Sequence, residues 1–554
     1  MKKEFKGYEL KKYKSFREIV ERNISEKGDK PGFLYREKGE VKTVLYSEFL
    51  NESSCLGNAL YDLGLSGRHV ACIGDNCYRM IVVFFTMLHS QGVYVPVDRQ
   101  LPEKDIVNVL NHSDSEVIFF TKKYKKKIIE NKDNFTSVKH FFCLDDEASD
   151  DYGSFDELIA KGRELKENGC RLYEESPGDT KALRVLVYTS GTTGMAKGVM
   201  LSEHSIVSDV SYGLTLTRLY DSAISILPYN HVYEAAGLLA EMACHVTIGI
   251  NDNIKNIMQN FNAYKPDSAY LVPAYVEAFY KRIWKQIGSK KPLIKAMIAL
   301  SNALRKLGID VRRKMFSMII KPFGGNLRKI ISGGAPLRPE IAEFFESIGI
   351  TVVNGYGISE CSPLISITRE GYEDCSTAGV PVPTTEVKII NPDENGIGEI
   401  CVKGNHVMLG YYKNEAETSR VIKDGWFNTE DLGYIDPEGR VVVTGRSKNM
   451  IVLKNGKNVF PEEIENYIQA IPYVSEVAVT SFKSEDGQEN GLCAHVYLDP
   501  NSEEAKKNDI GKILRKDIEA ACKPLPKYKK ITKINIRKEE FKKTTSNKIK
   551  RNEI

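Results

Sequence analysis

The chain has 554 residues, and at roughly 100–200 residues per domain this length leaves room for several structural units around a large buried core. Hydrophobic residues make up 42% and charged residues 27%, values typical of globular proteins, which excludes a disordered or fibrous chain. The 78 Lys and Arg against 74 Asp and Glu leave a net charge of +4, too small for a general nucleic-acid binder, so no nucleic-acid partner is expected.

The sequence shows few features that would direct the chain into a membrane or out of the cell. No apolar run reaches the roughly 18–20 residues of a membrane-spanning helix, and the longest, Met80 to Leu88, is typical of a buried core segment. The N-terminus lacks the apolar region of a signal peptide. Eleven cysteines are scattered from Cys55 to Cys522 without a CxxC pair, which indicates reduced thiols. A cytoplasmic location is expected.

In chain order, the first predicted elements are alternating strands and helices. Between Val70 and Thr121 short apolar runs alternate with segments that have polar faces, which predicts βαβ units and a mainly parallel sheet. From Arg184 the pattern returns in four strand candidates that each end in Gly, Pro, Ser or Asn: RVLVYTS, AISILP, SAYLVP and VVNGYG. Ligands of open α/β sheets bind beyond the carboxyl ends of strands, so a site is expected at these ends.

The C-terminal part of the chain has a different pattern. After about Thr377, short strands and Gly-rich turns indicate a small β-rich subdomain, about residues 378–446. A mixed α/β pattern then returns, in which Pro461 opens a helix. We expect an α/β fold: a large N-terminal domain of parallel-sheet α/β subdomains plus the β-rich subdomain, residues 1–446, and a small mobile α+β domain, residues 447–554.

Positive charge is concentrated in one segment. Residues 281–330 hold fourteen Lys and Arg against Asp310 alone, a local charge of +13, and the runs MIALSNAL and MFSMII make the segment amphipathic. One hypothesis is peripheral contact with anionic lipid at the inner face of the membrane, and the alternative is a solvated face of packed helices. A second basic run, residues 523–554, holds twelve Lys and Arg against three Glu.

The strongest local motif is YTSGTTGMAKGV, residues 188–199, directly after a strand candidate. Its glycines expose backbone N–H groups, while its hydroxyls and lysine add donors and charge, which together suit the polyphosphate of a nucleotide. It is not a Walker A loop, because glycine follows the lysine and the glycine spacing differs, which argues against a P-loop kinase or ATPase. The nucleotide-binding candidates here are Thr189, Ser190, Gly191, Thr192, Thr193, Gly194 and Lys197.

This loop resembles the phosphate-binding signature of the AMP-forming acyl-CoA synthetase family, and six further segments match that family in order along nearly the whole chain. They are the acyl-pocket segment LPYNHVYE (227–234), the adenine loop SGGAP (332–336), the Tyr-Gly-x-Thr-Glu motif NGYGISE (354–360), the ribose segment GWFNTED (425–431), the hinge GRSK (445–448) and the C-terminal lysine motif TTSNK (544–548). The resemblance implies ATP-dependent formation of an acyl adenylate, release of pyrophosphate, and transfer of the acyl group to coenzyme A, with Mg²⁺.

The resemblance also implies roles for single residues. Further nucleotide contacts are implied for Gly333, Gly334, Ala335, Pro336, Asn354, Gly355, Tyr356, Gly357, Ser359, Asp431 and Arg446. The acyl and thiol pocket is implied for His231, Val232, Tyr233 and Gly456. Glu360 has the hard carboxylate oxygen that Mg²⁺ prefers, and Ser359 beside it can donate to a phosphate.

The catalytic candidates are Lys548, Glu360, Thr189 and His231. By the resemblance, Lys548 supplies charge at the α-phosphate and the carboxylate while the adenylate forms. Lys448 is the implied hinge, about which the C-terminal domain swings to present the loop around Gly456 to the thiol. Two residues depart from the family pattern: Glu430 and Asn547 each stand where the family has glycine.

A medium- to long-chain fatty acid is the expected substrate. The stretch from Leu227 to Ala236 contains no Asp to hold an amino group, which argues against an amino acid, and the insert 282–326 is typical of the long-chain branch of the family. An apolar tunnel would contribute about 0.8 kcal/mol per buried CH₂. Three functions stay open: a fatty acyl-CoA ligase, a fatty acyl-AMP ligase that loads a separate acyl carrier protein, and a nucleotide-binding regulator without turnover.

Overall fold

The computed structural model describes residues 7–10, 13–176, 178–189, 196–371, 374–453, 457–483, 489–543 and 549–554. The chain divides into two compact units. Unit 1 contains residues 1–386 and 403–427, and unit 2 contains residues 387–402 and 428–554. This division groups residues 387–402 and 428–446 of the expected β-rich subdomain with the C-terminal residues and leaves residues 403–427 in unit 1, whereas the sequence predicts one subdomain within the N-terminal domain; the boundary after Arg446 stays a prediction.

The first sheet of unit 1 has nine strands in the order β16-β15-β14-β13-β12-β10-β11-β1-β2. From β14 to β1 the neighbouring strands are parallel, while β2, β15 and β16 are antiparallel additions at the edges. The bounds are β1 Pro31–Glu37, β2 Glu40–Leu45, β10 Ser222–Ser225, β11 Thr247–Ile250, β12 Ser268–Leu271, β13 Lys329–Gly333, β14 Thr351–Gly357, β15 Leu364–Ile367 and β16 Val380–Pro381. The strands expected at AISILP, SAYLVP and VVNGYG are confirmed.

The second sheet of unit 1 has eight strands in the order β19-β9-β8-β4-β3-β5-β6-β7. Strands from β8 to β7 are parallel, and β9 is antiparallel to both β8 and β19. The bounds are β3 His69–Ile73, β4 Val93–Pro96, β5 Ser115–Phe120, β6 His140–Cys143, β7 Gly153–Ser154, β8 Leu183–Thr189, β9 Lys197–Ser202 and β19 Gly410–Tyr411. The predicted βαβ units and mainly parallel sheet are confirmed.

Helices connect the strands of unit 1. Their bounds are α1 Phe16–Lys27, α2 Tyr46–Asp62, α3 Tyr78–His89, α4 Glu103–His112, α5 Lys125–Ile129, α6 Phe155–Glu167, α7 Glu203–Gly213, α8 Val232–Ala243, α9 Ile257–Tyr264, α10 Pro273–Ile287, α11 Lys291–Lys306, α12 Arg312–Met315, α13 Ser317–Ile320, α14 Pro339–Ser347 and α15 Glu415–Val421. In α3, every residue from Met80 to Leu88 is buried, so this run belongs to the core as predicted. Strand β20, Ile422–Lys423, pairs with Trp426 and Phe427.

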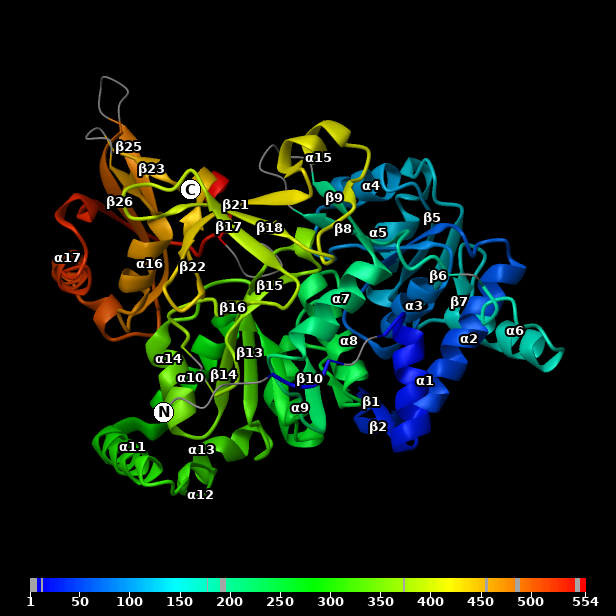
Figure 1. Ribbon diagram of the computed structural model, residues 1–554, viewed down its shortest axis with the longest axis horizontal. Helices are drawn as coiled ribbons and strands as arrows, with labels where there is room; N and C mark the ends of the chain where they lie inside the picture. Colours follow the sequence, from blue (N-terminus) through cyan, green and yellow to red (C-terminus); the bar gives the residue numbers. More distant parts are fainter. Residues whose placement is uncertain are drawn as a thin grey trace. The chain divides into compact units, whose positions relative to one another are not determined.

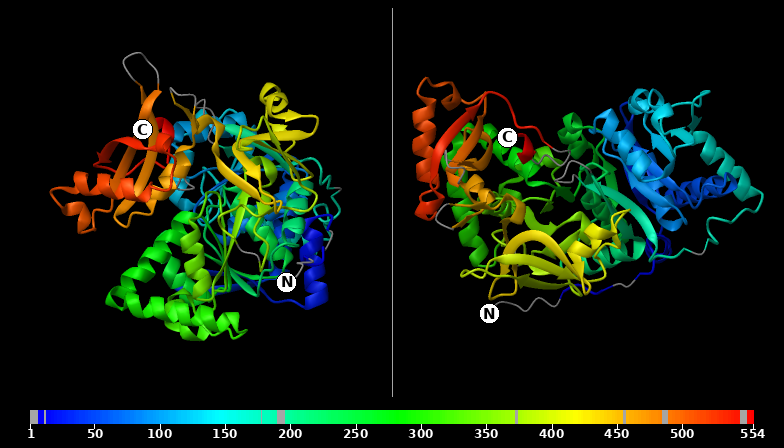
Figure 2. Two further views of the ribbon diagram at one scale, coloured as in Figure 1. Left: turned by 60° about the vertical axis from the view of Figure 1, so that its left-hand side comes forward. Right: turned by 90° about the horizontal axis from the view of Figure 1, so that it is seen from above.

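The basic segment 281–330 is helical. Helices α10 and α14 pack near β13 and β14, and α11 lies outside them, in contact with both (Figures 1 and 2). The core beneath contains Phe261, Phe279 and Phe323, whose rings pack at centroid distances of 5.2–5.9 Å. Burial of these rings fixes the inner side of the segment against unit 1.

The described residues of unit 2 form β-sheets and α-helices. Strands β17 Glu386–Ile390, β18 Gly398–Lys403, β21 Trp426–Ile435 and β22 Val441–Arg446 form one sheet, which β20 joins at β21. Strands β23 Ile451–Val452 and β24 Asn458–Val459 form a second sheet, and β25 Val474–Lys483, β26 Glu489–Leu498 and β27 Ile531–Arg537 form a third. Helices α16 Pro461–Gln469 and α17 Ile510–Ala521 pack on the third sheet (Figure 2). The helix expected to open at Pro461 is confirmed.

Among the described residues, no helix combines the length and apolarity needed to cross a membrane. All eleven cysteines lie in the described ranges, and no disulfide joins any of them.

Candidate functional site

Two of the predicted nucleotide segments lie side by side at the carboxyl ends of β13 and β14. The strands are parallel, and Gly333 at the end of β13 stands opposite Gly355 of β14. Gly334 follows with a φ of 82°, a backbone conformation that glycine adopts without steric cost. Ala335 and Pro336 continue this loop on the exposed surface. The expected adenine loop and the Tyr-Gly motif therefore share one sheet edge, where α/β sheets bind ligands.

Asn354 has a buried amide at this edge. Its Nδ2 donates to the carbonyl oxygen of Thr377 at 3.0 Å, and its backbone N–H donates to Thr368 Oγ1 at 2.8 Å. Its Oδ1 is buried and accepts no hydrogen bond from the described residues. An unmatched buried carbonyl oxygen is costly, so this atom suits a ligand that donates, such as the exocyclic amine of adenine.

The residues that follow Asn354 on β14 are half-buried. Tyr356 is half-buried, and a Cβ at Gly357 would lie 1.9 Å from the carbonyl oxygen of Pro363, so only glycine fits there. The close approach joins β14 to the turn that carries Ser359 and Glu360.

Tyr233 joins the predicted acyl-pocket segment to the same sheet. Its Oη donates to the carbonyl oxygen of Ile331 at 2.9 Å, and a Cβ added at Gly333 would lie 3.1 Å from its ring. Glycine at position 333 therefore permits this ring to lie against β13. The side chain of Tyr233 packs beneath the adenine loop, so the structure brings these two predicted segments together.

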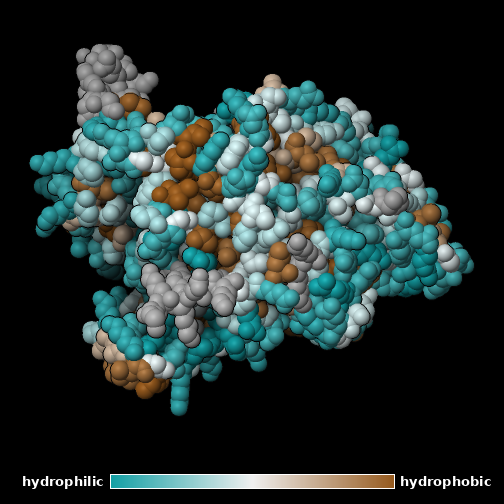
Figure 3. Space-filling model, in the orientation of Figure 1, coloured by the Kyte–Doolittle hydropathy of each residue, from teal (hydrophilic) through white to brown (hydrophobic). Residues whose placement is uncertain are grey.

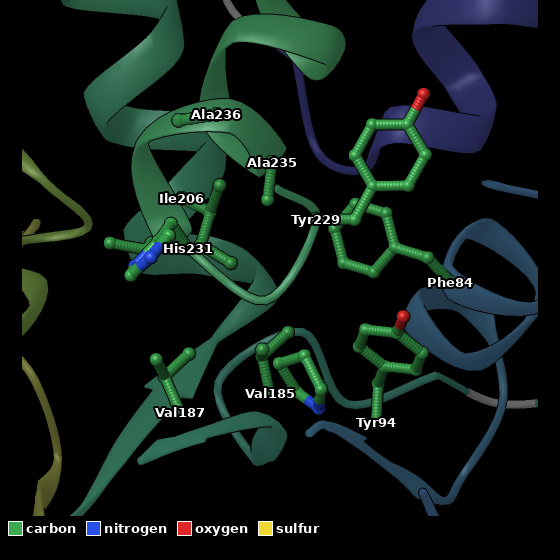
Figure 4. Close-up of a pocket in the computed structure, with 11 residues that line it drawn as sticks. Phe84, Tyr94, Val185, Val187, Ile206, Tyr229, His231, Ala235 and Ala236 are labelled. Atoms are coloured by element: carbon green, nitrogen blue, oxygen red, sulfur yellow. The ribbon is translucent and has the colours of Figure 1, made fainter. Parts of the chain in front are cut away.

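An apolar cavity lies between α3, β4, β8 and the start of α8 (Figure 4). Its wall consists of Phe84, Tyr94, Pro96, Val185, Val187, Ile206, Tyr229, His231, Val232, Ala235 and Ala236. The rings of Tyr229, Phe84 and Tyr94 stand in a row on one side, as Figure 4 shows. The cavity volume is about 10 Å³, the room of about one water molecule, so a hydrocarbon chain can enter only if the wall opens.

Two predicted pocket residues, His231 and Val232, belong to this wall, and the sequence analysis missed the others. Val185 and Val187 alternate along β8, so their side chains leave the same face of the sheet, and this alternation could have found them. Phe84 and Tyr94 carried no such signal, because they lie in runs that are buried throughout.

Behind the wall, α8 carries two buried carboxyl groups. Ser225 Oγ hydrogen-bonds to Glu234 and lies 3.1 Å from Tyr229 Oη. Burial raises the pKa of Glu234 to about 8, and it raises the pKa of Glu241 well above the ordinary range. Glu234 is therefore mostly protonated at neutral pH, and its neutral carboxyl holds Ser225 beside the pocket residue Tyr229.

Glu360 lies in a 3₁₀ turn, Ser359–Cys361, after β14. Its Oε1 accepts a hydrogen bond from Tyr411 Oη at 2.9 Å, and its carbonyl oxygen accepts one from the N–H of Met408 at 2.8 Å. Tyr411 belongs to β19, the edge strand next to β9. The segment 408–411 therefore holds the side chain and the backbone of Glu360, although Tyr411 is 51 residues further along the chain.

The same segment contacts the lysine of the Gly-rich loop. Thr189 and Lys197 stand opposite each other on β8 and β9, and the Nζ of Lys197 pairs with Glu417 of α15. That Nζ also lies 5.1 Å from the centre of the Tyr411 ring. Tyr411 thus touches both predicted charged groups of unit 1, Lys197 and Glu360. The sequence analysis missed Tyr411 and Glu417.

Glu417 is held by two cations. Arg420 binds its carboxylate at 2.7 and 2.8 Å, and this hydrogen bonding together with Lys197 lowers the pKa of Glu417 to about 2. The carboxylate is therefore ionised at neutral pH and keeps the ammonium group of Lys197 beside β19.

The donor set around Glu360 fits Mg²⁺. A carboxylate and the neighbouring Ser359 hydroxyl are hard oxygen ligands of the kind that Mg²⁺ takes. In the described ranges, no group of three His, Cys, Asp or Glu side chains is arranged to hold a metal ion. A magnesium ion here would take one protein carboxylate and complete its shell with water and nucleotide phosphates.

In unit 2, the predicted ribose pair lies on neighbouring antiparallel strands. Asp431 of β21 stands opposite Arg446 of β22, and Arg446 Nε lies 2.9 Å from Asp431 Oδ1. The Asp431 side chain is 5% exposed and that of Arg446 56% exposed. The carboxylate is thus fixed in place beside a guanidinium that faces solvent over half of its surface.

The structure explains the departure at Glu430. This residue has a φ of 59°, in the left-handed region that favours glycine, and its Oε2 lies 2.5 Å from the Nζ of Lys448. Glu430 therefore adopts the backbone conformation that suits the family's glycine, and it also binds the predicted hinge lysine.

Several predicted residues lie outside the described residues. They are Ser190, Gly191, Thr192, Thr193, Gly194, Gly456 and Lys548, together with Asn547.

Comparisons with known proteins identify related chains. A family model described as AMP-binding enzyme matches residues 20–412, and a second, described as AMP-binding enzyme C-terminal domain, matches residues 448–554. The solved structure of an anthranilate CoA ligase in complex with anthranoyl-AMP superposes with a TM-score of 0.79 at 19% identity, over 99% of this chain and 97% of that one. This likeness shows the fold.

Curated relatives are similar over most of the chain. Long-chain-fatty-acid–CoA ligase 5 of Rattus norvegicus is 30% identical over 82% of this chain and 71% of its own length. Fatty acyl-CoA synthetase B of Dictyostelium discoideum is 27% identical over 88% of this chain and 76% of its own length. A chloroplastic long-chain-fatty-acid–[acyl-carrier-protein] ligase of Arabidopsis thaliana is 26% identical over 84% of this chain and 73% of its own length.

Proposed function

The chain belongs to the AMP-binding enzyme family, and from this premise we propose that it is an AMP-forming long-chain fatty-acid–CoA ligase. The observation that carries the proposal is the identity of 27–30% to fatty acyl-CoA ligases over most of the chain. The apolar cavity beside His231 supports an acid whose body is hydrocarbon rather than one with a charged amino group.

In the proposed reaction, a carboxylate oxygen of the fatty acid attacks the α-phosphorus of ATP, and the bond to pyrophosphate breaks. The thiolate of coenzyme A then attacks the acyl carbon, and AMP leaves with the electron pair of the broken bond. Both steps bring anions together, so catalysis consists largely of positioning and charge neutralisation. Magnesium bound at Glu360 would add positive charge next to the phosphates.

The chain's own residues take the following proposed roles. The loop of Thr189 to Lys197 holds the phosphates, and the edge formed by Gly333 to Pro336 and Asn354 to Gly357 holds the adenine. Asp431 and Arg446 bind the ribose, and Lys548 acts in adenylation. His231 and Val232 line the acyl pocket, with Gly456 at the thiol. The proposed domains are 1–446 and 447–554, with Lys448 as the hinge.

The acyl acceptor has two candidates. Coenzyme A is the first, and the basic run 523–554 offers cations for its phosphates. A separate acyl carrier protein is the second, and the observation that favours it is the 26% identity to the Arabidopsis ligase, whose name gives that acceptor. We place the protein in the cytoplasm, with peripheral membrane contact through residues 281–330.

A pyrophosphate-release assay over saturated fatty acids of graded length, with and without coenzyme A, tests the proposal. We expect release of AMP and pyrophosphate that depends on the fatty acid and formation of acyl-CoA when coenzyme A is present. Turnover only with acyl carrier protein would select the second acceptor. Absence of fatty-acid-dependent pyrophosphate release, or formation of ADP, would contradict the proposal and leave the regulator hypothesis.

A further inference from the structure

The outer surface of α11 to α13 carries a cluster of exposed apolar side chains. Leu293, Leu300 and Leu307 are 58%, 55% and 76% exposed, and Ile309 and Met318 are 52% and 87% exposed. These five are among the thirteen large hydrophobic residues that are exposed in the described chain, so the apolar surface concentrates here. In Figure 3 hydrophobic residues gather at the lower left, where Figure 1 shows α11 to α13.

Helix α11 has two apolar stripes. The inner stripe contains Ile294, Met297 and Ile298, which pack on the core of unit 1. The outer stripe consists of exposed residues at spacings of three and four, which share one helix face: Leu293, Ala296, Leu300, Ala303 and Leu307. A surface helix needs one apolar stripe to attach to its domain, so the fold gives the outer leucines no role.

The structure also separates the cations of this segment into two groups. Four serve the fold: Arg312 binds Asp310 and Glu346, Arg313 binds backbone carbonyl oxygens, Arg328 binds Asp267, and Lys329 binds Glu370. The other ten are exposed and form no ion pair within the described ranges: Lys281, Arg282, Lys285, Lys290, Lys291, Lys295, Arg305, Lys306, Lys314 and Lys321. Most of the fourteen basic residues therefore take no part in holding the fold together.

We propose that the outer surface of α11 to α13 docks on a bilayer that contains anionic phospholipid. The leucine stripe would enter the boundary between headgroups and acyl chains, while the surrounding lysines lie at the lipid phosphates. A second copy of the chain is a poor occupant, because it would bring the same ten uncompensated cations against each other. A lipid surface supplies both the apolar phase and the negative charge that this surface lacks.

The proposal deepens the proposed function, because a ligase of fatty acids that rests on a bilayer meets its substrate there. Docking is inferred from the surface residues alone, however, and vesicle binding is measured without turnover of the ligase reaction. Failure of vesicle binding would therefore leave the proposed ligase reaction intact, and failure of the ligase assay would leave the docking surface intact.

Co-sedimentation of the full chain with vesicles tests the docking surface. One vesicle preparation is phosphatidylcholine alone, and the other contains equal parts of phosphatidylcholine and phosphatidylglycerol. We expect the chain to bind the anionic vesicles at least about tenfold more tightly than the neutral ones, because each Lys or Arg near an anionic surface contributes about 1 kcal/mol. Equal binding to the two preparations would overturn the proposal.

Two variants separate the charge from the apolar stripe. One replaces Lys290, Lys291, Lys295 and Lys306 by Gln, and the other replaces Leu293, Leu300 and Leu307 by Ser. Each is expected to weaken binding to anionic vesicles at least about tenfold. Matched controls carry the same exchanges at exposed positions elsewhere in unit 1: Lys38, Lys104, Lys181 and Lys255 to Gln, and Leu63, Leu172 and Ile254 to Ser. The controls are expected to bind as the wild type does.

Other outcomes identify other occupants. If the leucine variant changes the molar mass in light scattering but not vesicle binding, the stripe joins two copies and the proposal is wrong. If the lysine variant loses acyl carrier protein but keeps vesicle binding, the partner is a protein and the proposal is wrong. Melting temperatures report whether the variants fold. If the leucine variant does not fold, the lysine variant, which changes exposed side chains only, decides the question.

Discussion

At the scale of the residue, Tyr411 determines how Glu360 is presented. Its hydroxyl donates to the carboxylate that is proposed to bind Mg²⁺, and a hydrogen bond to a charged group is worth about 1.5–3 kcal/mol. We expect Tyr411→Phe to raise the Mg²⁺ concentration for half-maximal adenylation about tenfold or more and to weaken ATP binding by calorimetry when Mg²⁺ is present.

Tyr412→Phe is the matched control for this prediction. Tyr412 is the first residue after β19, and its hydroxyl donates to Asp114 Oδ2 at 2.7 Å rather than to Glu360. The control variant should keep the wild-type Mg²⁺ requirement. An equal shift in both variants would mean that the exchange disturbs β19 as a whole, and the role assigned to Tyr411 would be wrong.

Glu430 allows a prediction about backbone strain. At a φ of 59° the backbone of a residue with a Cβ is strained by about 1–2 kcal/mol relative to glycine. We expect Glu430→Gly to be more stable toward urea than Glu430→Ala by about 1 kcal/mol, because both variants lose the pair with Lys448 and only alanine keeps the strain. Equal stability of the two variants would contradict the assignment of strain.

At the scale of the element, α8 makes the stability of unit 1 depend on pH. The pKa of Glu234 is raised to about 8 by burial, so between its ordinary value and about 8 the native state binds more protons than the unfolded state. Stability is therefore lost as the pH rises through this range. Glu234→Gln stays neutral, and we expect it to flatten the fall in the free energy of unfolding, measured by urea titration at each pH, by about 5 kcal/mol at most.

Glu340→Gln, an exposed exchange in α14, serves as the control for the pH dependence. It should reproduce the wild-type curve from acidic to alkaline pH. If Glu234→Gln falls as steeply as the wild type, the neutral carboxyl at Glu234 is not the cause of the slope.

Helix α3 closes the apolar cavity that is proposed to take the acyl chain, and it does so with Phe84, whose ring packs 5.1 Å from that of Tyr94. A smaller side chain here opens the wall toward α3. We expect Phe84→Val to shift the ratio of kcat to KM toward longer or bulkier acids, with about 0.8 kcal/mol gained for each additional buried CH₂. Leu88→Ala in the same helix is buried but does not line the cavity, so it should lower stability without moving the chain-length profile.

The elements also show what the sequence could predict. Strands such as β3 and β14 and the helix at Pro461 follow from local periodicity and from their Gly and Pro boundaries, and all of them form where expected. The contacts of Tyr411 with Glu360 and of Lys197 with Glu417 join residues 51 and 220 positions apart. No local pattern carries such information, because it arises only when β19 pairs with β9.

At the scale of the whole molecule, the proposed reaction divides into two half-reactions that use different residues. By the family resemblance, Lys548 acts in adenylation and is withdrawn before thiolysis. We therefore expect Lys548→Ala to suppress fatty-acid-dependent pyrophosphate release by about 100-fold or more, the usual scale for removing an electrostatic contact made in a transition state. Conversion of supplied acyl-AMP and coenzyme A to acyl-CoA should remain near the wild-type rate.

Lys550→Ala is the matched control, because Lys550 follows two residues later in the same basic run and is exposed. It should leave both half-reactions near their wild-type rates, since its charge is expected to serve neither step. Equal loss of adenylation and thiolysis in Lys548→Ala would show that this lysine is needed in both conformations or for folding of the tail, and would count against domain alternation. Loss of thiolysis alone would reverse the assignment, placing the lysine at the thiol rather than at the α-phosphate. Measuring the rates of adenylation and of thiolysis separately on Lys548→Ala therefore distinguishes these alternatives, which the rate of the overall reaction does not.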